Sequence, residues 1–269
     1  MLKDITLGQF FPGQSVVHRT DPRVKIVLTL AFIILLFTVK GPVAYGLMAF
    51  YVFTVIFLSK ISCKVIFKGL KPIIFIVAFT AVINIFYTAG DVLWSFGIFK
   101  ITAQGIENAV YMVIRIILLI LGTSMLTYTT SPIMLTDAIE FLLSPLKKIK
   151  APVHELSMMM SIALRFIPTL IEETEKIMNA QKARGADFES GNLLNRAKAL
   201  VPILVPLFIS SFRRADELAT AMECRLYRGD VGRTRLRQFT ITSADYYSAA
   251  FTIAVGAAAI FCSNIGTFL

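Results

Sequence analysis

Charged side chains are scarce in this sequence: 16% of its 269 residues are charged, whereas 56% are hydrophobic. In soluble globular domains about a quarter of the residues are charged, and a smaller share than here is apolar. The composition therefore excludes an ordinary soluble domain and predicts an integral membrane protein. It also leaves no basic, aromatic-rich soluble domain, so we expect no nucleic acid partner in spite of the net charge of +10.

Cysteine and histidine are equally scarce, and their spacing excludes two kinds of site. Cys63, Cys224 and Cys262 stand singly without a CxxC pair, and His18 lies far from His154. Disulfide frameworks and metal sites need clustered or regularly spaced ligands. The sequence therefore predicts no disulfide, no metal site and no cofactor.

The common motifs of catalysis are missing as well. His154 and Glu155 form an HE pair, but Met158 stands where the HExxH zinc motif requires a second histidine. There is no GxSxG nucleophile motif and no glycine-rich phosphate-binding loop. We therefore expect a protein that is not an enzyme, has no catalytic residues and cannot hydrolyse ATP by itself.

Long apolar stretches dominate what is present. Five are long enough, or nearly long enough, to cross roughly 30 Å of hydrocarbon at about 1.5 Å per residue. They cover residues 24–39, 43–58, 72–89, 106–128 and 246–268. The fold class predicted from them is all-α, a polytopic bundle of about five transmembrane helices with a cytoplasmic-side domain of amphipathic helices.

Lysine and arginine are distributed unevenly outside these stretches. They concentrate at the N-terminus, after the second stretch and in the region 129–243, whereas the loops after the first and third stretches carry only Lys40 and Lys100. Because positive residues resist translocation, we expect the N-terminus in the cytoplasm and the C-terminus outside. The predicted organisation is a membrane domain with four helices at 1–128, a cytoplasmic helical region at 129–243 and a last span at 244–269.

An amphipathic helix is predicted to start near Pro152, after a short helix that begins at Ser131 and stops at Pro145. Its apolar residues recur at three and four positions, which predicts one buried stripe. Cations followed by glycine at 182–185 predict the end of this helix.

A second long helical region is expected from about Asn192 to Leu226. Its central run, 199–212, is very apolar, but it contains Pro202 and Pro206 and is short for a membrane span. We interpret it as buried or interfacial, with a sixth span as the alternative.

Both long helices end in a motif centred on arginine. A guanidinium at a helix tip can dock into an acidic or carbonyl-lined groove of a partner protein. Compensation of the helix dipole is the competing interpretation, and the residues alone leave both open. The two motifs are Ala183, Arg184 and Gly185 in the first helix, and Cys224, Arg225 and Leu226 in the second.

The first long helix also carries a soft apolar surface. Methionine side chains are unbranched and flexible, so they repack readily against different partners. Filling of the protein's own core would explain these methionines equally well. The residues of this surface are Met158, Met159, Met160, Ala163 and Leu164.

Arg115 lies inside the fourth stretch, where an isolated charge is expensive and often functional. We expect it to snorkel or to pair within the bundle. Autonomous channels and secondary carriers place ionisable or broken-helix sites in their spans, and only Arg115 and Asn84 stand out here. An autonomous channel or secondary carrier is therefore kept as the alternative function.

Over nearly its whole length the sequence resembles the transmembrane subunit of energy-coupling factor transporters, also known as the membrane component of cobalt, nickel and vitamin importers. The resemblance rests on several short segments taken together. These are residues 21–25 (DPRVK), 129–132 (TTSP), 163–168 (ALRFIP), 183–185 (ARG) and 221–223 (AME).

The resemblance implies a multi-pass scaffold in the cell membrane of a prokaryote that couples ATP hydrolysis to the import of vitamins or transition metals. In this family two coupling helices cross, and each inserts its terminal motif into a groove on one of two separate P-loop ABC ATPase subunits. Arg184 and Arg225 would be the inserted arginines. A small membrane substrate-binding subunit packs on the coupling helices, so the methionine surface at 158–164 is the candidate for that contact.

The second motif departs from the family pattern, because Cys224 and Leu226 flank the arginine where the family has alanine and glycine. Arg225 is retained as the expected coupling arginine. Arg228 is kept as an alternative, since Gly229 follows it and could also end the helix.

Overall fold

The computed structural model describes residues 10–88, 90–96, 99–186, 188, 193–229 and 239–266. Nearly all regular structure within these ranges is helical, which confirms the predicted all-α class. Contacts divide the described residues into two compact units. Residues 10–135 and 239–266 form the membrane unit, and residues 136–229 form the crossed-helix unit.

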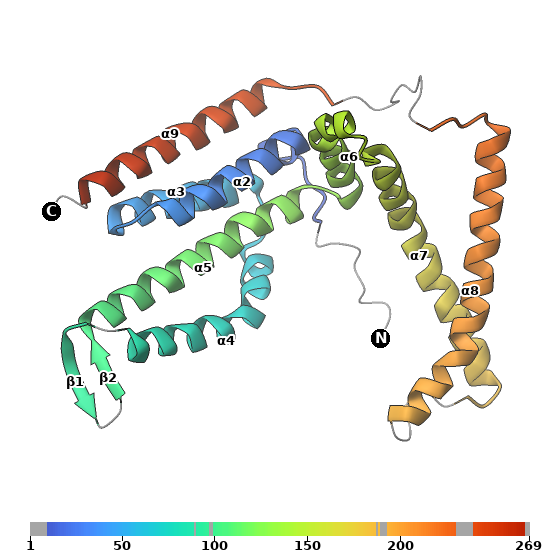
Figure 1. Ribbon diagram of the computed structural model, residues 1–269, viewed down its shortest axis with the longest axis horizontal. Coiled ribbons are helices and arrows are strands. Elements are labelled where there is room, and N and C mark those ends of the chain that lie inside the picture. The colour runs from blue at the N-terminus through green and yellow to red at the C-terminus, as the bar shows by residue number, and fades with distance from the viewer. Residues whose placement is uncertain are drawn as a thin grey trace. The chain divides into compact units, whose positions relative to one another are not determined.

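The membrane unit contains the predicted apolar helices (Figure 1). Four of them, α3, α4, α5 and α9, are long and apolar enough to span a membrane, and α2 has 17 residues, near the minimum for a span. Its elements are α1 (Val16–Arg19), α2 (Pro22–Thr38), α3 (Pro42–Ser59), α4 (Cys63–Tyr87), α5 (Ala103–Thr129) and α9 (Ser243–Gly266), with strands β1 (Val92–Phe96) and β2 (Phe99–Thr102) between α4 and α5.

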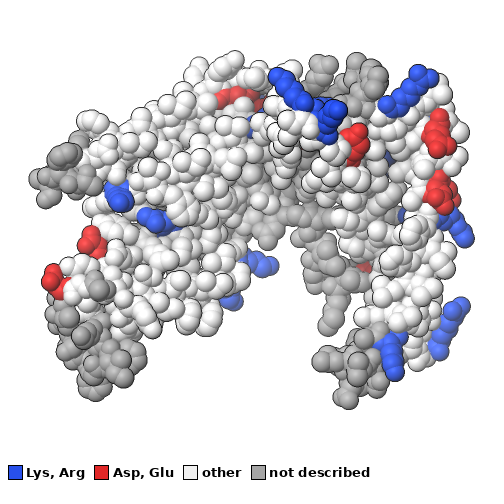
Figure 2. All heavy atoms as spheres, in the orientation of Figure 1, with Lys and Arg blue, Asp and Glu red and all other residues white. Residues whose placement is uncertain are grey.

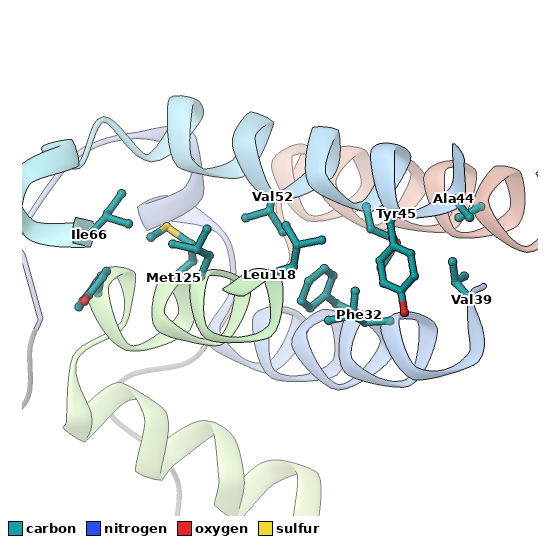
Figure 3. Close-up of a cluster of buried hydrophobic side chains, with 13 residues drawn as sticks. Phe32, Val39, Ala44, Tyr45, Val52, Ile66, Leu118 and Met125 are labelled. Carbon is teal, nitrogen blue, oxygen red and sulfur yellow. The ribbon is translucent and has the colours of Figure 1, made fainter. Parts of the chain in front are cut away.

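The core of the membrane unit lies where α2, α3, α5 and α9 meet, although α9 comes from the far end of the chain (Figure 3). Phe32 of α2 packs into this core against α5. A Cβ added to Gly122 would lie only 2.4 Å from the Phe32 ring, so glycine is required at this close approach. Small residues at helix contacts are typical of membrane bundles, where helices associate through close packing.

The outer surface of the membrane unit is apolar. Phe57, Phe75 and Tyr87 are at least 78% exposed, and Figure 2 shows mostly uncharged atoms over the face of α2, α3 and α5. Apolar patches of this extent are rare on soluble monomers and suit contact with lipid. The apolar outside and the packed core together explain why so hydrophobic a sequence folds into this bundle.

Two local features of the membrane unit were not predicted. An antiparallel hairpin of β1 and β2 joins α4 to α5. The lysines expected in a loop after the second span, at 64, 68 and 71, instead lie on the first turns of α4, which starts at Cys63. Figure 1 shows that α4 bends, and Pro72 supplies the cause because it removes one helical hydrogen bond.

The crossed-helix unit consists of α6 (Pro132–Leu143) from Thr136 onward, η2 (Ser144–Ile149), α7 (Val153–Ala183) and α8 (Leu193–Cys224). Figure 1 shows α7 and α8 crossing each other. The start of α7 after Pro152 and its end at Ala183 confirm the predicted limits. The expected start of the second helix at Asn192 lies outside the described residues.

The helix α8 runs without a break through Pro202 and Pro206. Pro206 has no N–H to donate to the carbonyl of Pro202, four residues before it. The side-chain amide of Gln181, from α7, donates to that carbonyl at 3.4 Å. The neighbouring helix therefore supplies the donor that proline removes.

Candidate functional site

The end of α7 has the hydrogen bonds of a Schellman motif. The N–H of Gly185 donates to the carbonyl of Lys182 at 3.0 Å, and the N–H of Ala186 donates to the carbonyl of Gln181 at 3.0 Å. Gly185 has φ +88°, the left-handed conformation that this motif requires. Arg184 is the C-cap residue, so its side chain leaves the chain at the tip of the helix.

The end of α8 repeats this geometry residue for residue. The N–H of Leu226 donates to the carbonyl of Glu223 at 2.9 Å, and the N–H of Tyr227 donates to the carbonyl of Met222 at 3.0 Å. Leu226 takes the left-handed position with φ +56°. Arg225 therefore occupies the same place at the end of α8 as Arg184 does at the end of α7.

Leu226 is an unusual residue for the left-handed position. That conformation costs a non-glycine residue roughly 1–2 kcal/mol, because Cβ approaches the following carbonyl oxygen. Leu226 is also 75% exposed, so burial of its side chain does not offset the cost. Strain of this kind persists only where surrounding contacts fix the backbone.

The arginines at the two ends are exposed. Among the residues that the structure describes, neither guanidinium of Arg184 or Arg225 forms a hydrogen bond or an ion pair. Arg228 is exposed too, but it follows the last hydrogen bond of α8 and has no counterpart after α7. The backbone equivalence thus pairs Arg184 with Arg225.

The two motifs lie at opposite ends of the α7–α8 pair. Gln181, near the end of α7, bonds to Pro202 in the first half of α8, whereas Tyr227, just after α8, bonds to His154 in the first turn of α7. The helices are therefore antiparallel. Two partner proteins could each hold one end without competing for the same surface.

A polar contact fixes the place where α7 and α8 cross. Glu173 of α7 accepts hydrogen bonds from Ser210 and Arg214 of α8, and the Glu173 Oε2 to Arg214 Nη2 distance is 2.7 Å. No sequence pattern pairs Glu173 with α8, because its partners lie 37 and 41 positions away. A bond between the two helices at the crossing resists sliding of one helix along the other.

A second polar contact lies at the start of α7. His154 Nδ1 lies 3.1 Å from Glu140 Oε1 of α6, and His154 Nε2 lies 3.3 Å from the hydroxyl oxygen of Tyr227. His154 and Glu140 are buried, with 7% and 9% exposed. The imidazole therefore bridges α6 to the residue that closes the Schellman motif of α8. No sequence pattern indicates this contact, because it joins residues 73 positions apart.

The apolar surface predicted on α7 is open rather than buried. Met159 and Met160 are 54% and 47% exposed, Ala163 is exposed, and Met158 and Leu164 are half-buried. The expectation of one buried stripe is therefore wrong for this part of α7 within the chain itself. A protein or lipid surface is needed to cover it.

An apolar stripe on α8 was not recognised as a surface from the sequence. Its members repeat every four residues, so they lie along one side of the helix. Each is between 48% and 65% exposed. They are Leu200, Val201, Leu204, Val205, Phe208, Ile209 and Phe212.

Comparison with known proteins identifies the family. The family model described as cobalt transport protein matches residues 13–236, most of the chain and both arginine motifs. A protein of Ruminiclostridium cellulolyticum named energy-coupling factor transporter transmembrane protein EcfT is 55% identical over 253 residues, which is 94% of this chain and 95% of that protein. The chain belongs to the family of energy-coupling factor transporter transmembrane proteins. Proteins of the same name from Thermosediminibacter oceani and Bacillus subtilis are 54% identical over 259 residues and 48% identical over 246 residues, covering 96% and 91% of this chain and 97% and 93% of those proteins.

Membership of the energy-coupling factor transmembrane family confirms the resemblance seen in the sequence. With the four apolar helices it identifies a bacterial, multi-pass membrane protein. The family segments 21–25 and 129–132 also prove to be neighbours. The Lys25 ammonium donates to the carbonyl of Thr129 at 3.0 Å and to the hydroxyl of Thr130 at 3.3 Å.

Asp21 in the first of these family segments has two structural tasks. Its carboxylate caps α2 by accepting from the N–H of Arg23 at 2.8 Å. Its own N–H donates to the carboxylate of Asp245 in the first turn of α9. These contacts tie the starts of α2 and α9 to the end of α5, so the segment is accounted for by the fold of the membrane unit.

Arg115 is held within the membrane unit of this chain. Its guanidinium donates to the hydroxyl of Tyr45 on α3 and lies 5.7 Å from the ring centres of Phe37 and Tyr45. Tyr45 in turn stacks on Tyr111. The expected pairing within the bundle is therefore the observed one, and aromatic rings take the place of an anion.

Proposed function

We propose that this protein is the transmembrane scaffold of an energy-coupling factor importer and that the ends of α7 and α8 are docking points for two separate P-loop ABC ATPase subunits. The observation that carries this proposal is the shared geometry of the two ends. Each presents an exposed arginine at the C-cap of a Schellman motif, and the motifs lie at opposite ends of one antiparallel pair. The segments concerned are 183–185 and 224–226.

The chemistry of the two ends suits insertion into a protein groove. A guanidinium stays charged and offers five directional donors to carboxylates or carbonyls. The unpaired carbonyls of a helix C-terminus already attract positive charge, so the side chain and the helix favour the same kind of environment. Closure of two ATPases upon binding ATP would move both ends, and the Glu173 contact at the crossing would carry that movement to the rest of α7 and α8.

A small substrate-binding membrane subunit is the proposed third partner. Two surfaces of the crossed-helix unit would accept it, the methionine surface on α7 and the α8 stripe defined above. Both are exposed, apolar and carried by helices that the ATPases would move. Because that subunit would recognise the substrate, the scaffold serves import of a vitamin or a transition metal through the bacterial cell membrane without binding it.

The alternative of an autonomous carrier finds little support in the membrane unit. A cavity of about 310 Å³ lies among α2, α3, α5 and α9, and Lys25 is the only charged residue in its lining. The Lys25 ammonium already donates to backbone and hydroxyl oxygens, and Arg115 is taken up by Tyr45. Both cations therefore already have partners within the bundle.

Co-purification tests the proposal. We expect the tagged native chain to bring down two P-loop ATPases and a small membrane protein from detergent-solubilised membranes. The Arg184→Glu, Arg225→Glu double variant should lose the ATPases, because a carboxylate repels the groove that accepts a guanidinium. Arg213→Glu, an exposed reversal on the side of α8, is the matched control and should keep them. Retention of both ATPases by the double variant would refute the docking assignment.

A further inference from the structure

The two docking ends differ in how their backbone is held. Gly185 adopts φ +88° without strain, and among the described residues no side chain bonds to residues 184–186. Leu226 must adopt φ +56° against its own Cβ. The end of α8 therefore needs outside support that the end of α7 does not.

That support is present in the bridge formed by Tyr227, His154 and Glu140. Tyr227 closes the Schellman motif through its N–H and at the same time reaches His154 with its hydroxyl. The imidazole is buried and is held on its other nitrogen by the Glu140 carboxylate. A side chain fixed at both ring nitrogens is a rigid anchor for whatever bonds to it.

We infer that His154 is a positioning residue for the second docking end: through Tyr227 it holds Leu226 in the left-handed conformation that aims Arg225. The bridge contacts only one of the two docking ends. The inference rests on the proposed function, since it assigns a role to the contact within the docking of one ATPase.

Cysteine reactivity offers a local test at each end. Cys224 precedes Arg225 and is exposed, so docking should shield it from a maleimide carrying polyethylene glycol, read as a gel shift. Cys63→Ser and Cys262→Ser leave Cys224 as the only thiol. The matched reporter at the other end is Ala183→Cys with Cys224→Ala, which exchanges the residues that precede the two arginines.

In the purified complex with its ATPases, Tyr227→Phe should raise the labelling rate of Cys224 about five- to tenfold, the factor expected from losing one hydrogen bond. The Ala183→Cys reporter should stay shielded in the same background. His154→Phe, which keeps a ring but no nitrogen, should act in the same direction as Tyr227→Phe.

Rescue separates positioning from general damage. Leu226→Gly removes the backbone strain, so adding it to Tyr227→Phe should restore shielding of Cys224 to within about twofold of the native rate, because the two changes are of similar size. Equal labelling of native and Tyr227→Phe complexes, loss of shielding at both ends together, or no rescue by Leu226→Gly would each overturn the inference. If Cys224 is not shielded even in the native complex, the proposed docking site itself is refuted.

Discussion

The ends of α7 and α8 reach one backbone geometry with different residues. After α7 the left-handed position is filled by Gly185, which adopts it freely, whereas after α8 it is filled by Leu226, which does not. The first end is therefore built from its own sequence, and the second depends on a contact with α7 and α6. The same helix ending is thus formed without glycine at the end of α8, where a tertiary contact lies beside the motif.

The largest effect should follow from replacing Gly185 at the end of α7 with leucine, the residue at the equivalent position after α8. A Cβ at Gly185 meets no atom within 4 Å, so the penalty of Gly185→Leu is conformational, roughly 1–2 kcal/mol. We expect docking at this end to weaken about five- to thirtyfold, measured by labelling of the Ala183→Cys reporter in the complex. Cys224 at the other end should stay shielded.

Gly185→Asn is the control for this substitution, because asparagine tolerates the left-handed conformation better than other residues with a side chain. It should retain most of the shielding. If Gly185→Leu and Gly185→Asn behave alike, backbone conformation does not set docking at the first end, and the contrast between the two ends disappears.

A smaller effect, shared by both ends, is expected at the crossing of α7 and α8. Arg214→Glu places a second carboxylate beside Glu173 and should weaken the contact by about 1 kcal/mol, since the pair is partly exposed. Both cysteine reporters should then label faster by a similar factor. The exchange Glu173→Arg with Arg214→Glu should recover much of the loss.

The variants at the crossing should affect both ends, because both ends belong to the α7–α8 pair. A change confined to one reporter would show that the crossing supports only that end. Failure of the charge exchange to recover shielding at either end would show that geometry at Ser210, and not charge, fixes the contact.

Features that depend on neighbouring residues could be predicted from the sequence. The cap of α2 by Asp21, the start of α7 after Pro152 and its end at Gly185 all follow from local hydrogen bonds and allowed backbone angles. The apolar helices followed from hydropathy. Features fixed by distant contacts were missed: the left-handed Leu226, and the donor from α7 that replaces the N–H missing at Pro206.

The exposed surfaces of α7 and α8 show a further limit of sequence patterns. An apolar stripe at helical spacing predicts that something covers it, and inside a single chain the simplest cover is the core. Met159 on α7 and Phe208 on α8 are exposed instead. The pattern was informative about burial but could not distinguish the protein's own core from lipid or another subunit.

The smallest effect is expected where the first end does contact α8. Gln181 donates to the carbonyl of Pro202 at 3.4 Å, a long and exposed hydrogen bond that water can replace. Gln181→Ala should therefore change labelling of the Ala183→Cys reporter less than about twofold. The backbone carbonyl of Gln181, which belongs to the Schellman motif, is unchanged in this variant. A large loss would mean that the first end also relies on α8, and that glycine alone does not make it independent.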